Sequence, residues 1–153
     1  MDRKLWKKEK ISHLVPSIGL LVYLSFLVWR MFFFAYSDVY RVKSNVPQYN
    51  LIPFRTIINF VIYFESNNLE VVLYNILGNI IVFIPLGFLI STILRRKKKT
   101  LIVMTTSLLL ILCAETMQLV LRVGVFDVDD IILNLIGCYL GYISSILVNK
   151  YYN

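Results

Sequence analysis

Four long apolar segments make up most of this 153-residue chain. They cover residues 14–36, 73–94, 100–121 and 131–148, with only a few polar interruptions. Each is close to the ~20 residues that an α-helix needs to cross the hydrocarbon core of a bilayer. Buried core helices of a soluble domain are a poor alternative, because 58% of all residues are hydrophobic. We therefore predict an all-α membrane protein with four transmembrane helices.

Basic residues indicate how such a chain would be oriented. Five Lys and Arg residues lie within residues 1–13, five lie within residues 95–99, and another is Lys150, which together are 11 of the 16. Four membrane crossings place these three regions on the same side. Since cytoplasmic loops carry an excess of Lys and Arg, we predict a multi-pass plasma-membrane protein with a basic N-terminus and both termini in the cytoplasm. The basic runs are short and flank spans, so nucleic acid is not an expected partner.

The long loop, residues 37–72, lies on the outer side in this topology. It contains an apolar stretch, residues 56–64, that is too short to span the membrane. We interpret this stretch as a short interfacial or re-entrant helix on the outer leaflet, with Pro53 in its first turn, where Pro is favoured. A plain loop packed over the helix ends is an equal alternative.

Polar residues recur at helical spacing in the predicted spans. Asn75 and Asn79 are four residues apart and share one face of the second span. Stripes spaced by three and four begin at Glu115 in the third span and at Asp127 before the fourth. In the predicted topology these stripes all lie near the outer side, where we expect them to meet. The candidate ligand-binding residues are Asn75, Asn79, Glu115, Gln118, Arg122, Asp127, Asp130 and Asn134.

These polar residues have two interpretations. A polar group in hydrocarbon is costly, so it persists there when it is paired or useful. For Asn75, Asn79 and Asn134 taken alone, we favour interhelical hydrogen bonds that hold the bundle together. For Glu115 we favour a function, because an intramembrane carboxylate is especially costly.

Further expectations concern neighbouring residues. Arg122 is a candidate counter-ion for Glu115, or an anchor at the headgroup level. Asp129 lies on the turn opposite the stripe and is expected to be solvated. Gly137 and Gly141 extend the stripe of the fourth span, and their spacing predicts a close approach between helices. With one His and no Cys-x-x-Cys pair, the chain is expected to have no His- or Cys-based metal site and no cofactor.

Several of these pieces occur together in an order typical of one family. They are Asn50-Leu51-Ile52-Pro53-Phe54; Asn75 and Asn79 followed by Phe83, Pro85 and Gly87; Glu115 with Gln118; and Arg122 followed by Phe126-Asp127-Val128-Asp129-Asp130, Asn134, Gly137 and Gly141. Residues 50 to about 145 thereby resemble the VanZ family of small bacterial membrane proteins. The resemblance implies an integral membrane domain over residues 14–149. It also implies a link to antibiotic resistance, since the founding member is associated with low-level resistance to the lipoglycopeptide teicoplanin.

The leading hypothesis for function is a binding protein at the outer face of the cell envelope. It would engage membrane lipids or a lipid-linked or amphiphilic molecule, such as a cell-wall precursor or the lipid tail of an antibiotic. The carboxylates would supply negative charge and the amides would supply orienting hydrogen bonds. The lipid part would lie between the second, third and fourth spans.

Two other classes of function stay open. In an enzyme acting on a lipid phosphate, Glu115, Asp127 and Asp130 would hold a divalent cation through oxygen ligands. No Ser, Cys or His nucleophile arrangement is visible, so we favour a protein that is not an enzyme. A small transporter or flippase is the second alternative, and its thin four-helix pathway would require a homo-oligomer.

Overall fold

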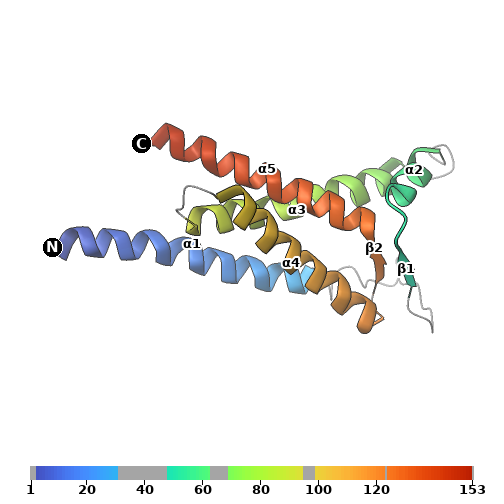
Figure 1. Ribbon diagram of the computed structural model, residues 1–153, viewed down its shortest axis with the longest axis horizontal. Coiled ribbons are helices and arrows are strands. Elements are labelled where there is room, and N and C mark those ends of the chain that lie inside the picture. Colours follow the sequence, from blue (N-terminus) through green and yellow to red (C-terminus); the bar gives the residue numbers. More distant parts are fainter. Residues whose placement is uncertain (1–2, 31–47, 63–68, 95–98, 123, 153) are drawn as a thin grey trace.

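The computed structural model describes residues 3–30, 48–62, 69–94, 99–122 and 124–152. Long helices dominate this part of the chain, and two very short strands accompany them (Figure 1). The elements are α1 (Arg3–Trp29), β1 (Gln48–Asn50), α2 (Arg55–Ile62), α3 (Leu69–Ile93), α4 (Lys99–Val120), β2 (Val125–Asp127) and α5 (Val128–Tyr152). The helical fold class is as predicted.

Three of the helices are long and apolar enough to cross a membrane. They contain the apolar stretches Asn75–Ile93, Thr100–Val120 and Val128–Tyr151. The apolar part of α1 within the described residues, Leu14–Trp29, is shorter, and residues 31–36 of the predicted first span lie outside them. The helices also extend beyond their apolar segments, because α1 already begins at Arg3, within the basic N-terminal stretch.

The four long helices lie roughly along the same axis and alternate in chain direction, so both termini lie at the same end of the molecule (Figure 1). We call this the terminal end. α2, β1, β2 and the first turn of α5 gather at the opposite end, which we call the α2 end. The start of α4 at Lys99 also lies toward the terminal end. The N-terminal stretch and Lys99 are therefore at the opposite end of the bundle from the aspartates in the first turn of α5.

Glycines bring the backbones of α3 and α5 into direct contact. A Cβ atom on Gly137 would lie 2.1 Å from the carbonyl oxygen of Ile80, and one on Gly141 would lie 1.9 Å from that of Ile84. On the other helix, a Cβ atom on Gly87 would lie 1.9 Å from the carbonyl oxygen of Cys138. No real side chain fits at such distances, so the predicted close approach at Gly137 and Gly141 is confirmed.

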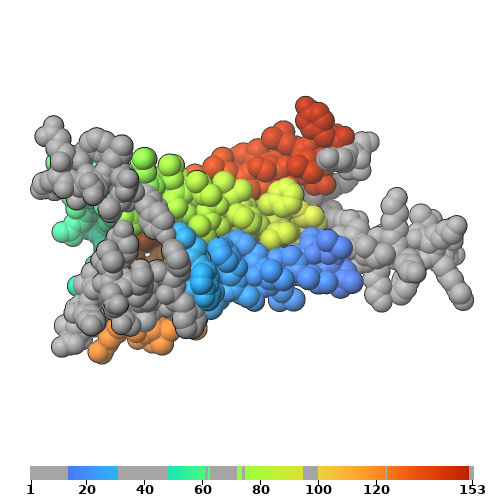
Figure 2. Space-filling model, turned by 180° about the vertical axis from the view of Figure 1, so that it is seen from behind, coloured from blue at the N-terminus to red at the C-terminus, as the bar shows by residue number. Residues whose placement is uncertain are grey.

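α1 lies along α3, as the space-filling view shows (Figure 2). The hydroxyl of Tyr23 donates a hydrogen bond to the carbonyl oxygen of Val82, which joins the two helices. On α4, Val103 and Ile111 are completely or almost completely buried, as is Leu86 of α3. The core therefore lies along the centre of the bundle, with α3 in contact with each of the other long helices.

The short strands β1 and β2 pair in parallel, with Gln48, Tyr49 and Asn50 opposite Val125, Phe126 and Asp127. No sequence pattern predicted this pairing. Because β2 directly precedes α5, the pairing places β1, and the chain that leads from it to α2, beside the start of α5. The helix predicted in that region is confirmed as α2, but it begins at Arg55, so Pro53 lies in the preceding turn and the prediction for Pro53 is wrong.

The glycine contact generates a first prediction. Gly87→Ala should lower the free energy of unfolding by about 1–3 kcal/mol, the usual cost of overpacking, because the added methyl meets the Cys138 carbonyl. Gly78→Ala is the matched control in the same helix, since its nearest contact would be an ordinary 3.6 Å to Arg30. Ala also favours a helix over Gly by about 1 kcal/mol. Thermal unfolding in detergent measures both variants, and equal stability would contradict the backbone contact.

Candidate functional site

Asp127 connects three elements at the α2 end. Its Oδ1 accepts a hydrogen bond from the backbone N–H of Asp129 at 2.9 Å, so Asp127 caps the N-terminus of α5. The same oxygen accepts from the side-chain amide of Asn50 at 3.1 Å, and Oδ2 accepts from the hydroxyl of Thr56 at 2.6 Å. Asn50 also donates to that Thr56 hydroxyl at 3.0 Å. Asp127 thus holds β1, α2 and α5 together.

Asp129 binds the N-terminus of α2. Its carboxylate accepts hydrogen bonds from the backbone N–H groups of Phe54, Thr56 at 2.8 Å and Ile57 at 3.2 Å. The first N–H groups of a helix have no partner within the helix and favour a negative charge. Asp129 is completely buried, so the prediction that it is solvated is wrong. The reason is that α2 folds back over the first turn of α5.

Asp130 connects α5 to α3. Its Oδ1 accepts a hydrogen bond from the side-chain amide of Asn79 at 2.6 Å. This confirms that the polar stripes of the second and fourth predicted spans meet. One helical turn after Asp130, Asn134 is almost completely buried, and its side-chain oxygen Oδ1 has no hydrogen-bond partner.

Glu115 contributes a carboxylate from α4 to the same region. Only 3% of this residue is exposed, yet Oε2 of its carboxylate has no hydrogen-bond partner. The backbone N–H of Asp127 donates to the carboxylate, and the charges of Asp130 and Asp127 act on it. The charges that act on Asp130 come in turn from Asp127 and Asp129. Carboxyl groups are therefore gathered in a buried place, where ionising all of them at once is costly because the repulsion between them is strong.

Arg122 does not neutralise this group of carboxylates. It lies at the end of α4 with a positive φ of 54°, and its side chain is exposed. Within the described residues it forms no ion pair with Glu115, so that expectation is wrong and the interfacial anchor is the remaining prediction. The backbone explains this result, because the left-handed turn ends the helix and directs the following chain toward β2.

The predicted site residues therefore divide into groups. Asn79 and Asp130 share a hydrogen bond, and the charges of Asp127 and Asp130 act on Glu115. Asn134 continues the stripe of Asp130, and we call these five residues the polar cluster. Gln118 lies beside Gly124, with its Cβ 3.4 Å from the position that a Gly124 Cβ would take. Asn75 is half-buried on α3 and also has an interaction partner.

Sequence reasoning missed three residues of this region, namely Asn50, Thr56 and Asp129. Asn50 stands at the start of the family-like motif, and Asp129 lies in the first turn of a helix, where acidic residues are favoured. These signals show that the residues are suited to capping. They do not indicate that the cap belongs to a helix 73 positions earlier in the chain.

The described residues provide no ready metal centre. No three His, Cys, Asp or Glu side chains among them converge closely enough to hold a metal ion. Asp127 and Asp129 already accept several hydrogen bonds, which reduces the number of oxygen atoms open to a cation. The geometry thus gives no support to a divalent-cation site formed by Glu115, Asp127 and Asp130.

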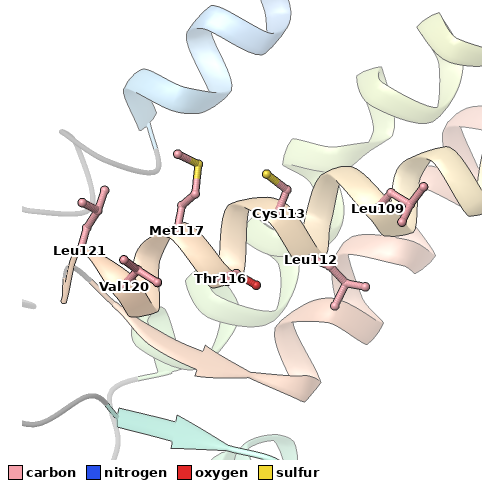
Figure 3. Close-up of a pocket in the computed structure, with 7 residues that line it drawn as sticks. All are labelled: Leu109, Leu112, Cys113, Thr116, Met117, Val120 and Leu121. Atoms are coloured by element: carbon pink, nitrogen blue, oxygen red, sulfur yellow. The ribbon is translucent and has the colours of Figure 1, made fainter.

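A hollow of about 440 Å³ lies along α4 (Figure 3). Its lining residues span positions 109–121, the stretch of the helix that also contains Glu115. Its lining is almost entirely apolar and consists of Leu109, Leu112, Cys113, Thr116, Met117, Val120 and Leu121. We call it the α4 groove. Leu112 lies one helical turn before Glu115 on α4. The other lining residues lie on the exposed face of the helix, away from the buried Glu115, and Cys113 and Met117 point toward the side of α1 (Figure 3). The groove is thus suited to an apolar chain.

Comparison with known proteins gives one clear result. A family model described as VanZ/LLP1 matches residues 10–149, which is nearly the whole chain. The match includes every residue of the polar cluster and of the α4 groove. No curated protein and no solved structure matches this chain.

The bonds of Asp129 lead to a second prediction. Asp129→Ala should release the N-terminus of α2, because three backbone N–H groups lose their acceptor. Hydrogen–deuterium exchange should show faster exchange, roughly tenfold or more for ~1.4 kcal/mol of lost local stability, at the amides of Thr56 and Ile57. Asn59→Ala, an exposed position on α2, is the control and should leave these amides protected. Unchanged protection in Asp129→Ala would exclude this role for the carboxylate.

Proposed function

Because this chain belongs to the VanZ/LLP1 family and is a helical membrane protein, we propose that it binds a lipid-linked or amphiphilic molecule at the outer leaflet. The observation that carries this proposal is the buried Glu115 carboxylate, whose Oε2 has no partner within the described residues. A charged group in such a place is costly, and a bound ligand is a direct way to compensate that cost.

The polar part of the ligand would meet the polar cluster. Asn79 donates to Asp130 and the backbone N–H of Asp127 donates to Glu115, so these hydrogen bonds fix part of the cluster before a ligand arrives. Organised groups lose little conformational entropy on binding. Asp127 and Asp129 support the site by holding β1 and α2 against α5.

The apolar part of the ligand would lie along the α4 groove. From the sequence we predicted it between the second, third and fourth spans, but α3 and α5 touch through their backbones at Gly137 and Gly141. That contact leaves no space for a lipid chain between these two helices. The α4 groove offers about 440 Å³ on the stretch of α4 that also carries Glu115, and its lining residue Leu112 lies one helical turn from Glu115.

The orientation of the protein is part of the proposal. With the basic residues at the terminal end, both termini would be in the cytoplasm and the α2 end outside, with α1 as a fourth span. Cys introduced at the exposed residues Tyr49 and Tyr151 tests this in a Cys113→Ala background. In intact cells, a membrane-impermeant thiol reagent should label Tyr49→Cys and not Tyr151→Cys. The opposite pattern would reverse the orientation.

The same binding would account for a contribution to antibiotic resistance. Teicoplanin is a lipoglycopeptide, hence an amphiphile, and the VanZ resemblance links the family to low-level resistance. We expect expression of the chain in a susceptible bacterium to raise the inhibitory concentration of teicoplanin. An enzyme or a flippase remains an alternative that no particular contact favours over binding.

Glu115→Gln separates a binding role from a structural one. The amide keeps the size of the side chain but removes its charge, so binding should be lost, while basal stability should stay equal or rise by roughly 1–3 kcal/mol because an unpaired charge is no longer buried. Native mass spectrometry measures co-purified lipid, and thermal unfolding measures stability. Thr105→Val, exposed on the same helix, is the control. Lower stability with unchanged lipid binding would identify Glu115 as a structural residue.

A further inference from the structure

The buried groups without partners in the polar cluster are both hydrogen-bond acceptors. They are Oε2 of Glu115 and Oδ1 of Asn134, and the two residues are 3% and 1% exposed. Leaving such atoms without a donor in a buried place costs about 1–3 kcal/mol for each atom. Asn134 lies one helical turn after Asp130 on α5, and the charge of Asp130 acts on Glu115 of α4, so both residues with an unpartnered acceptor are neighbours of Asp130. A ligand that satisfies both acceptor atoms must donate hydrogen bonds to them.

The charges around these atoms are of one sign. Asp130 and Asp127 act on Glu115, while Asp127 and Asp129 act on Asp130. The charges that act on Glu115 and Asp130 come from other carboxylates at the start of α5. A neutral donor such as water would satisfy the acceptors without adding positive charge, and a bound proton would neutralise a carboxylate without supplying donors to both residues. A group that satisfies both requirements is a cation with N–H donors.

We propose that the polar cluster binds the primary ammonium group of a membrane amphiphile, through Glu115, Asn134 and Asp130. This inference rests on the proposed function and specifies the headgroup that the same site would take. An ammonium group has three N–H donors and one positive charge, which matches two unpartnered acceptors and a carboxylate that accepts from Asn79 through only one oxygen. A metal ion fits less well, since no three acidic, His or Cys ligands converge among the described residues.

The test uses lipids that differ only in their N–H donors. Phosphatidylethanolamine and phosphatidylcholine with the same acyl chains carry the same formal charges, but the choline nitrogen has no N–H. The mono- and dimethyl derivatives of the ethanolamine lipid remove one donor at a time. Native mass spectrometry of the full chain, with each pair of lipids in competition, gives their relative affinities without any variant. We expect phosphatidylethanolamine to bind about tenfold or more tightly than phosphatidylcholine, as for a hydrogen bond to a charged group.

Two variants connect that preference to the cluster. Glu115→Gln and Asn134→Leu should each reduce the preference to within about twofold, whereas Thr105→Val should keep it. Thermal unfolding verifies that each variant is folded, and the comparison of lipids on the wild-type chain stands if Asn134→Leu does not fold.

The outcomes distinguish this inference from the proposed function. Saturable binding of both lipids with equal affinity would overturn the ammonium inference and leave amphiphile binding intact. A preference that survives in Glu115→Gln would also overturn it, because the selecting group would lie elsewhere. If neither lipid, nor any other amphiphile that co-purifies, binds in a saturable way, the proposed function itself fails and water is the occupant of the cluster.

Discussion

The carboxylates in the first turn of α5 are the feature on which the α2 end depends. Asp129 accepts three backbone N–H groups from the start of α2, and Asp127 caps α5 while binding Asn50 and Thr56. Short elements such as α2 and the pair of β1 and β2 have little stability alone. Their attachment to α5 is what gives them a fixed place, and it closes the end of the bundle where the polar cluster lies.

The tight packing of α3 against α5 supports the cluster from the middle of the bundle, whereas the carboxylates of α5 fix the α2 end. Gly87, Gly137 and Gly141 allow the two backbones to touch, which provides a firm support without large side chains. Asp130 and Asn79 lie at the end of this contact and share a hydrogen bond. Glu115 approaches from α4, so the cluster combines one firmly packed pair of helices with a third helix whose outer face carries the apolar groove. A rigid pair of helices beside a helix with an exposed groove is suited to a site that holds its polar groups in place and can still be reached from the lipid.

Helical periodicity explains what the sequence could predict. Asn79, Glu115, Asp130 and Asn134 lie on local stripes, and each stripe follows from spacings of three and four within one helix. The membrane topology then brings the stripes to the same end, which is why their meeting was predictable. The role of Asp129 was not predictable in this way, since its partners Phe54 and Thr56 are 75 and 73 positions away and no periodicity connects them with Asp129. The exposed position of Arg122 likewise depends on one left-handed backbone conformation at the end of α4.

The central claim is that the polar cluster holds a ligand and is not only a set of bonds between helices. The most direct measurement is a crystal structure of the full chain, extracted with its native lipids and crystallised in a lipidic mesophase. The account predicts density in hydrogen-bond contact with Oε2 of Glu115, continuous with a chain that runs past Leu112 and Thr116 into the α4 groove. A single water beside Glu115, or a side chain of this protein donating to Oε2, would contradict it.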